Sequence, residues 1–161
     1  LVEAVLANNR GIQSSTGQGD DERLAMLDAA LAASARGPAA NRARLLALSA
    51  LERLHTAPFE QRLALADEAL EVARSSGDAD TIAQVLTVRH NAIRVPATLE
   101  QRLADTAEAM ALTAHGEDLL AQYWACEHRV RSASEVPDLV EVSPGHFVAP
   151  SSDSILSEMI K

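Results

Sequence analysis

The sequence predicts an all-α fold built from antiparallel helical hairpins, and three observations support this. Leu, Ala, Val and Ile recur three and four residues apart along most of the chain, which is the spacing of one face of a helix. Gly or Pro follows each such run and would end the helix. The pentapeptide EQRLA occurs at residues 60–64 and again at residues 100–104, and each copy opens a helical run.

Six helical runs follow a short opening segment. In that segment, LVEAVLANN, the side chains of Val2, Val5 and Leu6 share one face, so we expect the second helix of an earlier hairpin that packs on the next helix. The later runs are expected at 20–34, 40–55, 59–76, 79–93, 99–115 and 118–132.

Two helix ends carry recognisable signals. Gly77 is expected to adopt the left-handed conformation that ends many helices. Thr98, with Gln101 three residues later, fits the capping box of a helix start. Aromatic residues make up only 2% of the chain, so we expect a core of many small contacts between Ala and Leu side chains.

The helices repeat as three copies of one unit. EQRLALADEALEVARSSGDADTIAQ aligns with EQRLADTAEAMALTAHGEDLLAQ if two single residues are deleted in the turn between the helices, and this alignment makes His90 equivalent to His128. A looser copy, DERLAMLDAALAASARG, precedes them, so the period is 38 to 40 residues. Stacked hairpins share a core that one hairpin alone cannot close. The sequence therefore predicts a right-handed, tetratricopeptide-like solenoid.

We divide the chain into three parts. Residues 1–19 are expected to hold the end of a preceding helix and a linker, residues 20–136 the three hairpin repeats, and residues 137–161 an irregular or disordered tail. Because the end units lack polar caps, we expect the isolated chain to form a two-fold homodimer through one end. Alternatively, the tail folds back on the last hairpin as a makeshift cap, using residues such as Val140, Val142, Phe147 or Ile155.

Charge and composition exclude several classes of protein. The net charge of −9, with no cluster of Lys or Arg, argues against direct binding to nucleic acid. No apolar run approaches the roughly 18 residues that span a bilayer. Cys126 is the only cysteine, which fits a reducing compartment, and we expect a cytoplasmic protein without a cofactor.

Three arginines are candidate partner-binding residues. Arg23, Arg62 and Arg102 each fall in the first turn of the first helix of a repeat. If the first helices line the inner face of a solenoid, these side chains form an exposed ladder for an acidic peptide. The alternative is structural: the guanidinium groups cap turns or contact acidic neighbours such as Asp105.

A second candidate site is a groove near His90, Tyr123 and His128. Such a groove would suit a small molecule. Cys126 and His128 project in different directions from a helix, so burial is a better reading than metal binding. The sequence contains no recognisable catalytic constellation, and we expect no enzymatic activity.

The repeated phrases carry a family resemblance. ANNRG, DDERLAMLDAALAA, NRARLLALSALE and the two EQRLA units, over about residues 1–133, resemble the helical-repeat region of large actinobacterial regulators. Those proteins carry a STAND or AAA type nucleotide-binding module, often with a LuxR-type DNA-binding domain or a class III nucleotidyl cyclase. The resemblance implies a non-catalytic interaction or sensor module of a transcriptional or signalling regulator, which binds a protein, a peptide or other domains of the same parent chain. A small-molecule-binding or enzymatic domain and a structural spacer are the alternatives.

Overall fold

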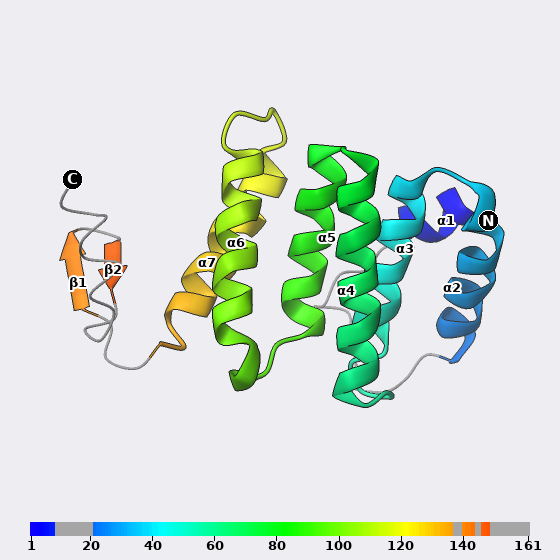
Figure 1. Cartoon of the computed structure of the whole chain (residues 1–161), viewed down its shortest axis with the longest axis horizontal. Helices are drawn as coiled ribbons and strands as arrows, with labels where there is room; N and C mark the ends of the chain where they lie inside the picture. Colours follow the sequence, from blue (N-terminus) through cyan, green and yellow to red (C-terminus); the bar gives the residue numbers. More distant parts are fainter. Residues whose placement is uncertain (9–20, 137–139, 144–145, 149–161) are drawn as a thin grey trace.

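The fold is described from a computed structural model, over residues 1–8, 21–136, 140–143 and 146–148. Up to Val136 the described residues form only helices and short connections (Figure 1), so the predicted all-α class is confirmed for this part of the chain. The α-helices are α1 (Val2–Ala7), α2 (Asp21–Ala33), α3 (Ala39–Glu52), α4 (Phe59–Ser76), α5 (Ala79–Ala92), α6 (Leu99–Thr113) and α7 (Leu119–Ala133). Two 3₁₀ turns adjoin them, η2 (Ser34–Arg36) and η3 (Pro96–Thr98).

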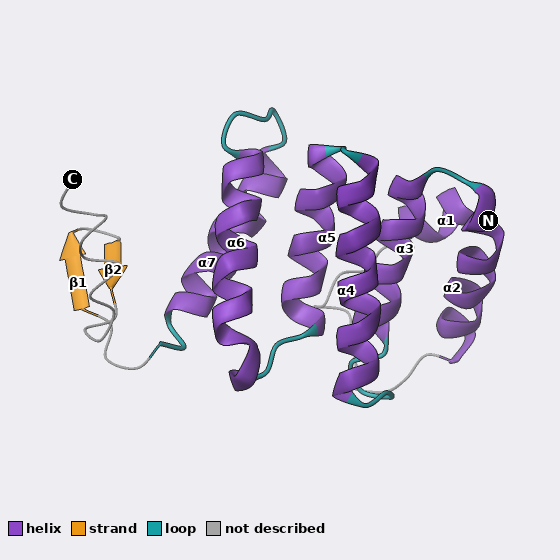
Figure 2. Cartoon of the chain, in the orientation of Figure 1, coloured by secondary structure: helices purple, strands orange, loops and turns teal. Residues whose placement is uncertain are grey.

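Consecutive helices pair as hairpins, α2 with α3, α4 with α5 and α6 with α7. The hairpins stand side by side, with α4 and α6 in one layer and α3, α5 and α7 in the layer behind them (Figure 2). Helix α1 packs on both α2 and α3, because Val5 lies in one apolar cluster with Leu27 of α2 and Leu45 of α3. The packing of α1 on the helix that follows it is therefore as predicted.

Small side chains dominate the main core, as the composition predicts. Its buried residues come from α3 to α7, and six of the ten are alanines. Ala lets helix axes approach closely, but each Ala makes few contacts, so the arrangement of the helices must be fixed by many small contacts together. Leu70 of α4 and Leu86 of α5 are among the few large buried side chains, and polar contacts add further links between helices.

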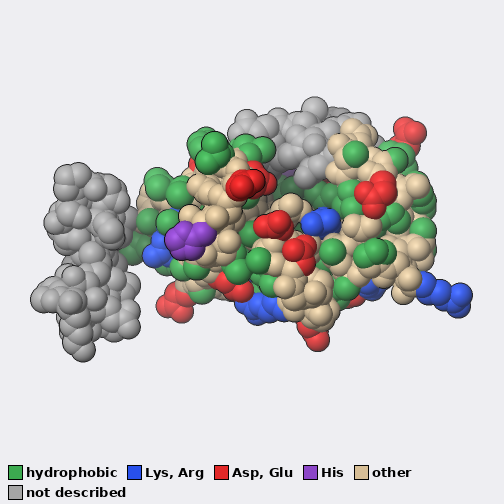
Figure 3. All heavy atoms as spheres, turned by 90° about the horizontal axis from the view of Figure 1, so that it is seen from above, with side chains coloured by type: hydrophobic (Ala, Val, Ile, Leu, Met, Phe, Trp, Pro, Cys, Tyr) green, Lys and Arg blue, Asp and Glu red, His purple; other side chains and the backbone are tan. Residues whose placement is uncertain are grey.

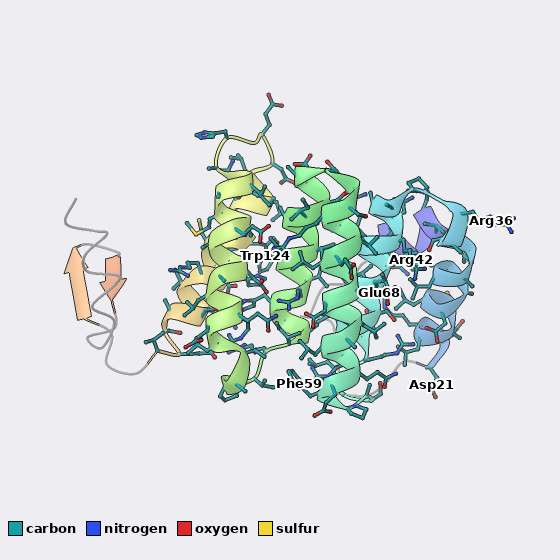
Figure 4. The ribbon with its side chains drawn as sticks, in the orientation of Figure 1. Asp21, Arg36, Arg42, Phe59, Glu68 and Trp124 are labelled. Carbon is teal, nitrogen blue, oxygen red and sulfur yellow. The ribbon has the colours of Figure 1, made fainter. Side chains whose placement is uncertain are left out.

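Ion pairs join neighbouring hairpins. Arg42 of α3 meets Glu68 of α4 at 2.8 Å (Figure 4), and Arg74 of α4 meets Glu108 of α6 at 2.6 Å. These ion pairs are largely exposed and therefore add little to the stability of the fold. The guanidinium of Arg89 on α5 is fully buried and binds carboxylates of both α4 and α6, so it fixes the position of two hairpins at once.

Local signals set most helix ends. Gly77 has φ of 68°, the predicted left-handed conformation, and its N–H donates to the carbonyl of Arg74. The carboxylate of Asp118 accepts hydrogen bonds from the first N–H groups of α7. The predicted capping box at Thr98 is wrong: this hydroxyl donates to the carbonyls of Ile93 and Val95 and leaves α6 without a side-chain cap.

The helices correct the repeat alignment. Helices α3, α5 and α7 begin at Ala39, Ala79 and Leu119, each forty residues after the previous one. The two deletions made in the sequence alignment are therefore not needed. With a spacing of forty, His90 corresponds to Val130, and His128 corresponds to Val88.

Two short strands follow the helices. Strands β1 (Val140–Ser143) and β2 (His146–Val148) form an antiparallel hairpin with Val140 opposite Val148. This segment belongs to the range 137–161 that the sequence analysis expects to be irregular. The rest of that range, and the linker at 9–20, lie outside the described residues. Among the helices that the structure describes, none combines the length and the hydropathy needed to cross a membrane.

Candidate functional site

The three repeated arginines do not form an exposed ladder. The exposed fractions of Arg23, Arg62 and Arg102 are 3%, 8% and 0%. Each side chain runs from the first helix of its hairpin to the end of the second helix. The prediction that these residues are accessible to an acidic peptide is wrong.

Their contacts explain why they are buried. The Nε of Arg23 lies 2.5 Å from Glu52 at the end of α3, and Arg62 donates to the carbonyl of Ala92 at the end of α5. Arg102 makes two hydrogen bonds to the carboxylate of Glu135, just after α7. A cation at a helix C-terminus is stabilised by the unpaired carbonyls and the helix dipole. The repeated arginine thus ties the two helices of each hairpin together.

A pocket of about 620 Å³ lies between α1 and the second helices of the hairpins, α3, α5 and α7. Two rows of equivalent residues line it at the forty-residue spacing. One row is formed by Arg44, Gln84 and Trp124, and the other by Leu48, Val88 and His128. Leu6 of α1 also lines the pocket. The second helices of the hairpins therefore build this site, whereas the sequence analysis placed the partner-binding residues on the first helices.

The pocket has an apolar floor and a few polar groups at fixed positions. The guanidinium of Arg44 donates to Thr81 Oγ1 at 2.8 Å and lies 3.8 Å from the Asp78 carboxylate, which holds it at the rim. The Asn91 amide lies 3.3 Å from His128 Nε2 and donates to it. Such a site can take an apolar group and offers hydrogen bonds at its edge.

His128, in the pocket wall, stacks on His90 behind it, with their ring centroids 4.2 Å apart. Both rings are buried. Burial is the main cause that lowers the pKa of His90 from 6.5 to about 3, and the neighbouring His128, Arg102 and Arg94 lower it further. Burial likewise lowers the pKa of His128 to about 4, against the opposing charge of Glu127. At neutral pH the two rings are therefore uncharged and hold α5 against α7.

The predicted groove near His90, Tyr123 and His128 is correct only for His128. His90 lies behind it and does not line the pocket, and Tyr123 projects from the opposite face of α7 with 57% of its surface exposed. Trp124 takes the place predicted for Tyr123 (Figure 4). Within the described ranges, no group of three or more His, Cys, Asp or Glu side chains could hold a metal ion.

The sequence analysis missed the pocket row at Arg44, Gln84 and Trp124. The signal was the constant spacing of forty residues, which the two deletions concealed by pairing Gln84 with Gln122. Acidic and basic side chains are scattered among apolar ones on the face shown in Figure 3 and do not gather into a basic patch there.

Comparisons with protein-family models, with curated proteins and with solved structures found no match to this chain. What the described residues define is an all-α protein with an apolar pocket that is built from equivalent residues of successive second helices.

Proposed function

We propose that this chain is a non-catalytic interaction or sensor module, and that its hairpins form a tetratricopeptide-like solenoid. The observation that carries the proposal is the pair of residue rows, spaced by forty, that line one pocket. Equivalent positions on successive second helices face the same space, as in a repeat array that binds its partner along one surface.

The lining favours an apolar segment of a protein partner as the ligand. The floor is formed by Leu48, Val88 and further aliphatic side chains, and Trp124 adds an aromatic face. Aromatic and aliphatic anchors supply most of the binding energy in such contacts. Gln84 and Arg44 at the rim would hydrogen-bond the backbone or a polar side chain of the segment. The resemblance to regulators supports the proposal that this module belongs to a larger transcriptional or signalling protein.

A small molecule is the second candidate ligand, and the size of the pocket favours it. Sites for drug-sized ligands occupy about 300–1,000 Å³ and are mostly apolar with a few placed polar groups. The volume of about 620 Å³ lies inside that range.

Peptide selection with the full chain tests the proposal. Random peptides are displayed and enriched on the wild-type protein, and then compared on Val88→Phe, which fills the pocket with an apolar ring. Met26→Phe is the matched control, because Met26 is an exposed residue of α2 outside the pocket. We expect the enriched peptides to lose at least about tenfold in affinity on Val88→Phe, about 1.4 kcal/mol, and to bind Met26→Phe as they bind the wild type.

Circular dichroism of both variants establishes that the fold is intact. Peptides that bind the folded Val88→Phe variant as tightly as the wild type would contradict the proposed site. If no peptide is enriched and a small molecule stabilises the wild type but not Val88→Phe, the second candidate is favoured.

A further inference from the structure

An ion pair links α3 to the start of α5 at the rim of the pocket. The guanidinium of Arg44 donates to Thr81 Oγ1 at 2.8 Å and lies 3.8 Å from the carboxylate of Asp78. Asp78 stands one residue before α5 and caps this helix by accepting from the N–H of Thr81. A carboxylate that caps a second helix can therefore also hold a cation from the second helix before it.

Between α5 and α7 the equivalent carboxylate is present, but the cation is replaced. At the spacing of forty residues, Gln84 of α5 takes the place of Arg44, and Asp118, one residue before α7, takes the place of Asp78. Gln84 and Asp118 both line the pocket. Asp118 Oδ1 accepts from two N–H groups in the first turn of α7. Within the described residues, neither Asp118 Oδ2 nor the side-chain amide of Gln84 has a hydrogen-bond partner.

The ionisable groups that line the pocket favour a cation. The carboxylates are those of Glu3 and Asp118, and the charge of the lining guanidinium, Arg44, is balanced by Asp78. Glu3 accepts a hydrogen bond from a neutral amide of α3. His128 is uncharged at neutral pH, because burial lowers its pKa to about 4. A cation in the pocket therefore meets two carboxylates that no cation of the described residues neutralises.

We propose that the partner segment carries an Arg or Lys side chain, which binds between Gln84 and Asp118, and apolar residues beside it, which bind on the floor of the pocket. This inference rests on the proposed function and adds the chemistry of the partner to it. The charged end donates to Asp118 Oδ2 and to the side-chain oxygen of Gln84, as a charge-assisted hydrogen bond. The aliphatic stem of Arg or Lys packs on apolar surface, here that of Val88 and Trp124.

A double-mutant cycle tests the place of the cation without any partner. Gln84→Arg supplies a guanidinium from the exposed position that corresponds to Arg44, and Asp118→Asn removes the charge but keeps the cap, since Asn caps a helix as well as Asp does. At low salt, Asp118→Asn should lower the urea midpoint of Gln84→Arg further than that of the wild type. Gln84→Met, a long uncharged side chain, is the matched control and should show no such coupling. No coupling between Gln84→Arg and Asp118→Asn would overturn the proposal.

Peptide selection with the full chain tests the partner. Peptides enriched on the wild type should contain Arg or Lys beside apolar residues, and this preference should disappear on Gln84→Arg, whose own guanidinium takes the place. An enriched peptide remade with Gln at the basic position should bind the wild type at least about threefold more weakly at low salt. On Asp118→Asn the two forms of the peptide should bind equally. Asp80→Asn, an exposed carboxylate of α5 outside the pocket, should keep the wild-type preference.

The results separate this inference from the proposed function. Peptides that lose affinity on Val88→Phe but bind equally well without their basic residue would overturn the cationic partner and leave the proposed function intact. A preference for the basic residue that persists in Asp118→Asn would also overturn this inference. Peptides that bind Val88→Phe as tightly as the wild type would overturn both proposals.

Discussion

Replacing His90 by Leu tests the stacked histidine pair as the source of acid sensitivity. The pKa of His90 is lowered to about 3 and that of His128 to about 4, both from 6.5. A His whose pKa is lower in the folded state stabilises the fold fully above pH 6.5, and this stability is lost as the pH falls below 6.5 toward the folded pKa. Each unit of pH in that window costs about 1.36 kcal/mol per His.

The expected loss of stability follows from the pH range over which the histidines are charged only in the unfolded chain. Between pH 6.5 and pH 5 each His lowers the free energy of unfolding by about 2 kcal/mol, so that of the wild type should fall by about 4 kcal/mol. In His90→Leu only His128 remains, and the loss should fall to about 2 kcal/mol. Within the described residues, neither ring nitrogen of His90 has a hydrogen-bond partner. Leu therefore leaves no partner unpaired, and stability at pH 7 should change by less than about 1 kcal/mol.

Urea unfolding followed by circular dichroism at pH 7 and pH 5 gives these free energies. His115→Leu is the matched control, because His115 is exposed in the turn before α7, and it should show the full wild-type loss. The reasoning fails if His90→Leu and the wild type lose the same free energy between the two pH values.

Three further substitutions test the packing. Gly77→Ala should lower the free energy of unfolding by about 1 kcal/mol, because a residue with a side chain is strained at φ of 68°. Gly116→Ala should lower it by less, and thermal melting of the two variants measures the difference. Arg89→Met should lower the free energy of unfolding by about 3–5 kcal/mol, because it leaves the buried carboxylate of Asp105 on α6 unpaired. Asp67→Asn, which changes the exposed partner of Arg89, should lower it by less than about 1 kcal/mol. If Arg89→Met costs no more than Asp67→Asn, this assignment is wrong. Leu70→Asp should abolish cooperative unfolding, since it puts an unpaired carboxylate in the main core, and an unchanged melting curve would refute this assignment.

The helices could be predicted because their signals are local. Apolar spacing and the Gly and Pro stops located all six later runs to within about three residues at each end. The conformation of Gly77 is equally local, since only the residues around it decide whether a helix ends there. The β1–β2 hairpin has no such signal, because its short strands lie among Pro, Ser and Gly.

The site could not be predicted because it depends on where long side chains point and on the register in which the repeats are aligned. A position in the first turn of a helix does not tell whether Arg62 points to solvent or reaches the end of the next helix. The two-residue error in the alignment moved His90 into the place of Val88. Only the packed helices show that Gln84 and Trp124 occupy equivalent positions.

The central claim is that a partner binds in the pocket between the second helices. Trp124, the only tryptophan of the chain, lines this pocket, so its fluorescence reports on the site directly. Titration of the wild type with a selected peptide should shift the emission of Trp124 to shorter wavelength and protect it from acrylamide quenching. Saturating binding that leaves both the emission and the quenching of Trp124 unchanged would contradict the account.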